Sequence, residues 1–248
     1  MKGKRYWLVL VALGLLFAAD VLISANRKSV DLWLAANVII GADGRIASLE
    51  WHEDREAGKA IAKMLEPEIR GWEFEPGTLK GAPTETRTRL TLRVALDEGD
   101  DGAMAVRIRT ARTGAYADTM SPPRYPPDGY RNGVHASVVT VVDVATDGTA
   151  TIVEMIYSGS RKHHAAREAF LDATRAAVAT WHFIPERVGG HSVATRMRIP
   201  VAFCLDSAQW CKQQRGAEEM REDAGPPDTP VALESAVRLL TPLNGGKI

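Results

Sequence analysis

The two cysteines, Cys204 and Cys211, are the side chains whose type and spacing define the clearest chemistry in this sequence. Thiols this close along the chain can close a short loop as a disulfide in an oxidising compartment. The alternative is a pair of free, partly buried thiols, because spacing alone does not reveal pairing geometry. Two cysteines do not make a zinc site, since a structural zinc ion takes four ligands.

His163, His164 and Glu168 are a second group with metal-binding side chains, at the start of an expected helix. Residues four apart share a helix face, so His164 and Glu168 could approach one ion. The sequence places no third ligand near them, and a solvated helix face is the simpler interpretation. We therefore expect neither a metal nor a cofactor.

No catalytic motif stands out in the sequence. It contains no Gly-x-Ser-x-Gly elbow, no His-Glu-x-x-His, no Walker loop and no dinucleotide glycine fingerprint. Lys plus Arg and Asp plus Glu each number 31, so no net charge attracts nucleic acid. Hydrophobic residues make up 45% and charged residues 25%, as in folded globular proteins. We expect a binding protein that is not an enzyme and has no nucleic-acid partner.

The N-terminal segment, residues 1–25, has the pattern of an export signal. Lys2, Lys4 and Arg5 precede an apolar run that continues to Ala25. This run is interpreted either as a cleaved signal peptide or as an apolar helix that anchors the chain in the inner membrane. In both cases the positive end stays in the cytoplasm and the rest of the chain reaches the periplasm.

The second half of the chain predicts a hairpin, a helix and a last strand. β-branched residues over 136–145, the turn dipeptide Asp147-Gly148 and the returning segment 149–156 form the hairpin. Ser158 or Ser160 is placed to cap the helix. The apolar stripe of that helix consists of Ala166, Phe170, Ala173, Ala177, Val178 and Trp181. In the last strand, Arg196 to Leu205, apolar residues alternate with Arg196 and Arg198.

The same series of signals occurs earlier in the chain. Trp72-Glu73-Phe74-Glu75-Pro76 recurs 109 residues later as Trp181-His182-Phe183-Ile184-Pro185, and Asp43-Gly44 recurs 104 residues later. Pro67 predicts that the first helix stops or kinks near Glu66. We therefore predict an α+β fold with two tandem β-β-α-β units after an N-terminal apolar helix. Each unit is expected to have an antiparallel three-stranded sheet and one packed helix.

These patterns divide the chain into five parts. They are the leader 1–25, a first unit 30–98, a linker 99–118, a second unit 119–205 and a tail 206–248. The tail either docks on the units or stays mobile. The residues expected in the structural core are Trp72, Phe74, Phe170, Trp181, Phe183 and Pro185.

The second unit resembles the TonB C-terminal domain. The resemblance rests on Pro123-Arg124-Tyr125-Pro126, the Val-rich strand, Asp147-Gly148, the Trp181 element, Gly190 and Ile199-Pro200-Val201-Ala202-Phe203, in that order. The first unit resembles the same domain in degenerate form. The resemblance implies a periplasmic protein, anchored at the inner membrane, that supports transport. Its last strand would capture a segment of an outer-membrane transporter or another envelope protein by β-strand addition.

The last strand of this second unit has a residue that fits such pairing. Pro200 lacks an amide donor and is tolerated on an edge strand, so one side of the strand should be open. The implied partner-binding residues are Tyr125, Pro126, Arg196, Arg198, Pro200, Val201 and Phe203. The two arginines could instead protect the edge against aggregation. A proline at Val201 is expected to abolish binding if the amide of that residue faces outward.

Two departures from the family pattern concern energy transduction. The apolar segment Tyr6 to Ala25 contains no histidine, and no long proline-rich rod precedes the first unit. The resemblance therefore does not extend to coupling with the proton gradient. The alternative function is a structural scaffold or dimerisation module of the cell envelope. In that case the sheet edges would pair within a homodimer.

Overall fold

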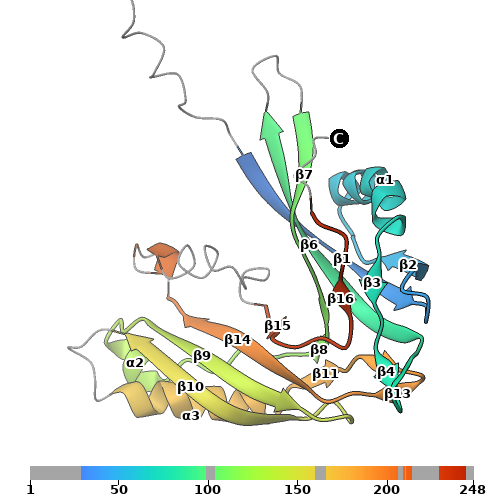
Figure 1. Ribbon diagram of the computed structural model, residues 1–248. Coiled ribbons are helices and arrows are strands. Elements are labelled where there is room, and N and C mark those ends of the chain that lie inside the picture. The colour runs from blue at the N-terminus through green and yellow to red at the C-terminus, as the bar shows by residue number, and fades with distance from the viewer. Residues whose placement is uncertain are drawn as a thin grey trace, which may run out of the picture.

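The computed structural model describes residues 29–98, 104–159, 166–205, 209, 211–213 and 229–243 (Figure 1). Strands predominate, with few helices, and the fold is α+β. The apolar helix expected over residues 1–25 lies outside the described residues. No helix in the described part of the chain has the length and apolar character needed to cross a bilayer.

The first sheet is built around β1 (Ser29–Ile40). It pairs antiparallel with β2 (Ile46–Trp51) on one side and β6 (Thr86–Glu98) on the other. β7 (Met104–Gly114) continues the sheet by pairing with β6, and α1 (Glu56–Arg70) packs against it. Alternate side chains of β1 and β6 face the helix and are buried. This core includes Leu34, Ala36, Val38, Ile40, Ala62, Leu65, Ile69, Leu90, Leu92 and Val94.

Helix α1 continues through Pro67 to Arg70, so it does not stop near Glu66 as one of the two expected outcomes had it. The proline removes a backbone hydrogen bond only in the last turn. Leu65 and Ile69, on either side of it, are both 0% exposed. Packing of this apolar face on the sheet stabilises the last turn despite the proline, because most helical stability in proteins comes from tertiary contacts.

The second sheet has β9 (Ala136–Val144) at its centre, between β10 (Ala150–Gly159) and β14 (Thr195–Phe203). A short strand, β15 (Val231–Ala232), pairs with the other side of β14. α3 (Arg167–Val178) covers one face of this sheet (Figure 1). The core between them includes Val138, Val142, Phe170, Leu171, Val178, Trp181, Phe183, Met197, Ile199 and Phe203.

The start of α3 differs from the sequence-based expectation. The N-cap position is occupied by Ala166, and no side chain caps the helix. Ser158 belongs to β10, and Ser160 lies outside the described residues. A second short helix, α2 (Pro127–Arg131), precedes β9.

Both units run in the order strand, strand, helix, short strands, long strand. In the first unit the short strands are β3 (Phe74–Glu75), β4 (Thr78–Leu79) and β5 (Ala82–Pro83). In the second they are β11 (His182–Ile184), β12 (Arg187–Val188) and β13 (His191–Ser192).

The two Asp-Gly turns make the same contact in both units. Gly44 and Gly148 have positive φ angles of 77° and 86°. The amide of Phe74 donates to the carbonyl of Gly44, and that of Phe183 donates to Gly148, each at 2.9 Å. A Cβ atom at either glycine would lie 2.2 Å from the following phenylalanine carbonyl oxygen, so only glycine fits.

The sheets are not separate three-stranded units, which corrects the expectation. β12 of the second unit pairs with β6 of the first, so the first sheet has six strands. Their order is β13-β12-β6-β1-β2, with β7 also on β6, and the second sheet is four-stranded in the order β10-β9-β14-β15. The extra pairs satisfy backbone groups that three-stranded sheets would leave unpaired at their edges.

Residues 99–118, the expected linker, contain much of two strands. β7 pairs with β6 from Arg89 to Glu98, and β8 (Tyr116–Thr119) pairs with β11. Val106 and Ile108 in β7 are buried in the first core. β6 and β7 are therefore antiparallel neighbours, and residues 99–103 between them lie outside the described residues.

The tail docks on both units over residues 229–243. β15 pairs with β14, and β16 (Arg238–Leu239) pairs with β3. Val231 and Val237 are buried. Figure 1 shows this segment, in red, passing from the second sheet along the first unit. The described part of the tail therefore follows the docked alternative.

Glu186 joins the second unit to the first unit and to the tail. Its side chain is 2% exposed. Oε1 accepts hydrogen bonds from the hydroxyls of Thr88 at 2.5 Å and Ser235 at 2.9 Å, and Oε2 accepts from the amide of Ala236 at 2.6 Å. Burial raises the pKa of Glu186, and the three hydrogen bonds oppose that effect only in part.

Glu186→Gln is expected to change how stability depends on pH. Because the pKa is raised in the folded state, folding retains a proton that the unfolded chain releases near its pKa of about 4.3. This residue therefore makes the free energy of unfolding fall as pH rises through the unfolded pKa and up to the folded one. Glutamine does not titrate, so the Glu186→Gln variant lacks this pH dependence. Its free energy of unfolding relative to wild type should therefore rise as pH increases from the unfolded pKa of Glu186 to the folded one.

Urea unfolding at a series of pH values measures this difference. Glu85→Gln is the control, since the Glu85 side chain is 55% exposed. Equal pH slopes for wild type and Glu186→Gln would contradict the assignment.

Candidate partner-binding site

β14 is the strand that the sequence marks for partner binding. β9 pairs with one side of it along all nine residues. On the other side β15 pairs at Met197 and Arg198, and the amide of Leu233 donates to the carbonyl of Arg196 at 2.8 Å. The expectation of a fully open side from Arg196 to Leu205 is therefore wrong for the first part of the strand. The C-terminal segment of the chain itself covers that part.

The outer side of β14 from Ile199 to Phe203 has no paired strand among the described residues; we call it the open edge. The carbonyl of Arg196 points to this outer side, toward Leu233. Backbone groups of alternate residues in an antiparallel ladder point the same way, so those of Pro200 and Ala202 also face outward. Since proline has no amide hydrogen, the open edge offers the carbonyl of Pro200 and both backbone groups of Ala202.

The same alternation directs the amide of Val201 toward β9. Val201 lies opposite Val138 in the register of the two strands, and its side chain is 8% exposed. A proline at this position would disrupt the sheet itself. A Val201→Pro variant was expected to abolish binding only if the amide of Val201 faces outward, and it does not. The open edge is therefore better tested by a substitution at Ala202.

The two arginines of β14 have different surroundings. Arg196 is exposed, and its Nε and Nη2 atoms donate to the two carboxylate oxygens of Asp143 at 2.7 and 3.1 Å. These hydrogen bonds lower the pKa of Asp143 and raise that of Arg196. Arg198, which alternation places on the same face as Arg196, is 6% exposed. Alternation predicted its face of the sheet but not that this face is covered.

An aromatic group fixes the end of β14. The Tyr125 ring meets Phe203 and Phe170 edge-on, with centroids 5.7 and 5.6 Å away, and Phe170 meets Phe203 at 4.9 Å. The Tyr125 hydroxyl donates to the carbonyl of Val134 and lies 3.4 Å from that of Phe203. Pro126 is buried just before α2. The contacts of Tyr125 with Phe170 and Phe203 therefore fix the position of this end of the strand.

Five of the six expected core residues are buried. They are Trp72, Phe74, Phe170, Trp181 and Phe183. The indole nitrogen of Trp181 also donates to the carbonyl of Ser121 at 2.8 Å, which ties the helix end to the lead-in of the second unit. Pro185 is only partly buried.

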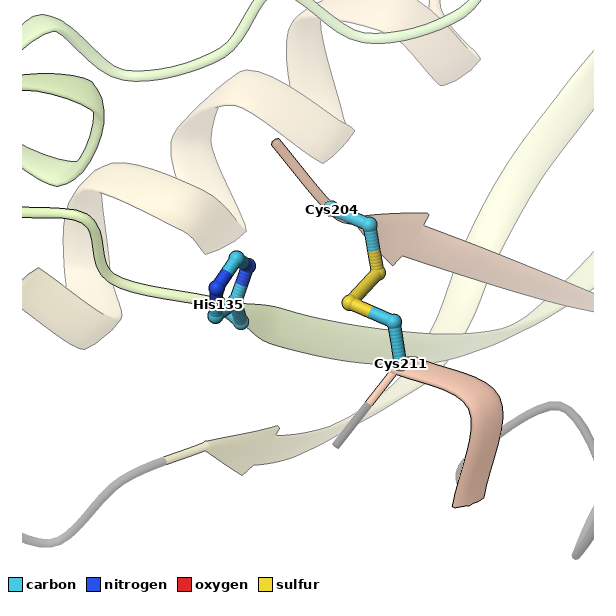
Figure 2. A group of neighbouring side chains, drawn as sticks. All are labelled: His135, Cys204 and Cys211. Carbon is cyan, nitrogen blue, oxygen red and sulfur yellow. A yellow bond between two sulfur atoms is a disulfide. The ribbon is translucent and has the colours of Figure 1, made fainter. Parts of the chain in front are cut away.

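Cys204 and Cys211 form a disulfide, with Cα atoms 6.1 Å apart (Figure 2). It ties residue 211 to the end of β14. His135 lies beside it, and the possible ligand atoms of the three residues are within 4.8 Å of one another. In a disulfide neither sulfur is a thiolate, the form that binds metals. The sequence did not predict that His135 lies beside the disulfide, because His135 is distant from both cysteines along the chain.

The other candidate ligands from the sequence are not brought together. His163 and His164 lie outside the described residues, and Glu168 is exposed at the start of α3.

Part of the chain is similar to a known protein family. Residues 121–205 match the model of the Gram-negative bacterial TonB protein C-terminal family. Proteins called Protein TonB from two strains of Xanthomonas campestris pv. campestris are each 39% identical to the chain over 87 residues. The match covers 35% of this chain and 36% of each relative, about a third of their length. Residues 121–205, which run from the lead-in to the end of β14, are therefore identified as a TonB C-terminal domain.

Proposed function

We propose that the chain is a TonB-like periplasmic protein held at the inner membrane by residues 1–25. It binds an outer-membrane transporter or another envelope protein by β-strand addition at β14, in support of transport. The observation that supports this most is the family match of residues 121–205, in which the last strand has an open edge from Ile199 to Phe203. In strand addition, main-chain hydrogen bonds provide affinity and side-chain pockets provide specificity.

The open edge by itself is short. The outward groups of Pro200 and Ala202 provide three possible backbone hydrogen bonds, each worth about 1 kcal/mol net. A partner segment that pairs with the whole of β14 must displace β15, which is two residues long. Such an exchange is inexpensive because the new ladder replaces the pairs that are lost, and short peripheral segments open locally at low free energy. We therefore include the release of β15 in the proposed binding step.

We also infer that residues 30–98 and 119–205 are copies of one duplicated unit. The support is the common order of elements and the shared glycine contact at Gly44 and Gly148. In this view the first copy supplies the sheet to which the β12–β13 hairpin attaches.

A scaffold or dimerisation role is the second candidate, and one observation favours it. β10 is the outer strand of the second sheet, and Val153 and Ile156 on it are 50% and 53% exposed. Exposed apolar residues on an outer strand are suited to edge-to-edge pairing between two copies of the chain.

Two measurements together separate these functions. Sedimentation velocity at low micromolar concentration gives the oligomeric state, and a pull-down from solubilised outer membranes detects a receptor. A monomer that recovers an outer-membrane receptor is the expected result. A stable dimer that recovers none would contradict receptor binding and favour the scaffold.

A further inference from the structure

A cavity of about 360 Å³ lies between the first sheet and the docked tail, and the open edge of β14 contributes no described residue to its lining. Trp33 and Tyr116 contribute aromatic side chains to its lining, and Arg89, Arg112 and His52 contribute basic ones. No Asp or Glu is among the described residues that line it. The cavity therefore combines apolar surface with positive charge, and its volume is within the range of small-molecule sites.

Arg89 contributes a partly buried positive charge to this cavity. Its Nη1 atom donates to the amide oxygen of Asn37 at 3.1 Å, and its guanidinium carbon lies 4.8 Å from the centroid of the Tyr116 ring. Both groups are neutral, and no carboxylate in the described part of the chain forms an ion pair with Arg89. Burial accordingly lowers the pKa of Arg89. A partly buried charge without a counter-charge is unfavourable, and a bound anion would offset that cost.

Arg112 places a second positive charge on the same cavity. In the β6–β7 ladder Arg112 is opposite Thr91, and Gly114 is opposite Arg89, so the two arginines project from neighbouring strands. Arginine side chains match the planar geometry of a carboxylate and can bind it through two parallel hydrogen bonds. The aromatic rings of Trp33 and Tyr116 offer flat apolar surface next to these charges.

We propose that this cavity binds a small carboxylate with a flat apolar body. Arg89 holds the carboxylate, Arg112 adds a second positive charge beside it, and the apolar body lies against Trp33 and Tyr116. Thr229 to Ala232 form one wall, so the site is complete only when the tail is docked. A partner segment that displaces β15 from β14 would also remove this wall, because Val231 and Ala232 belong to β15. The proposal itself does not rest on the proposed function.

Titration of the full-length protein with 2-naphthoate tests the site, with uncharged 2-naphthamide as the matched ligand. Isothermal calorimetry should give saturable binding of the carboxylate, with the amide at least about tenfold weaker, because a charge-assisted hydrogen bond is lost. This comparison uses the wild-type protein and needs no substitution. Equal affinities for the two ligands, or no saturable naphthoate binding up to about 1 mM, would overturn the proposal.

Arg89→Gln locates the charge that is responsible. It should weaken naphthoate binding at least about tenfold and leave naphthamide binding unchanged. Arg87→Gln is the matched control, since Arg87 lies two residues away on β6, is exposed and does not line this cavity. Circular dichroism verifies that both variants are folded. An equal loss of naphthoate binding in both folded variants would refute the role of Arg89, because it would indicate a general charge effect.

Discussion

Trp181→Ala is expected to lower the free energy of unfolding by about 3 to 5 kcal/mol, because the deletion leaves a cavity in a packed core. The side chain is 4% exposed in the second core. Its indole nitrogen also donates to the carbonyl of Ser121, and that bond is lost with the ring. Since the free energy of unfolding of a whole domain is only about 5 to 15 kcal/mol, this loss would remove a large part of the stability of the second unit.

Urea unfolding followed by circular dichroism measures this loss. Met64→Ala is the control, because Met64 is 41% exposed on α1 and its truncation should change stability by no more than about 0.5 kcal/mol. Trp181→Phe retains most of the ring volume and lacks the hydrogen bond to Ser121, so it should fall between wild type and the alanine variant. An unchanged unfolding midpoint for Trp181→Ala would refute the core assignment.

Local signals were sufficient for the elements of each unit. An Asp-Gly turn between β-branched segments predicted the hairpin at Gly148, and the three- and four-residue spacing of Phe170, Ala173 and Ala177 predicted the helix that packs on it. These signals depend on residues that are close together along the chain. Each family motif is likewise a short local pattern, and the order of these motifs over residues 121–205 was sufficient to indicate the family.

The junction between the units could not be predicted from such signals. It depends on pairs that are distant in sequence, such as Arg187 with Arg87 and Glu186 with Thr88. Pattern analysis gives the face on which a side chain lies, but not what covers that face. Arg198 and the docking of β15 on β14 illustrate this limit. Pro67 does too, because tertiary packing overrides a local preference there.

Ala202→Pro is the substitution expected to affect partner binding most. It removes the only amide donor on the open edge, since Pro200 already lacks one, and its ring occupies space that a neighbouring strand needs. Because alternation directs this amide away from β9, the pairing of β14 with β9 should persist, and the change in unfolding free energy should be smaller than for Trp181→Ala. Recovery of the outer-membrane receptor should fall at least about tenfold, the equivalent of about 1.4 kcal/mol.

Ala202→Val is the matched control for this variant. It retains the amide and has high β-propensity, so receptor recovery should remain near that of wild type. Val201→Pro, by contrast, should destabilise the second unit, because the amide that it removes faces β9. If folded Ala202→Pro recovers the receptor as well as wild type does, strand addition does not use β14. The exposed outer strand β10 would then be the edge to test, since its other side is already paired with β9.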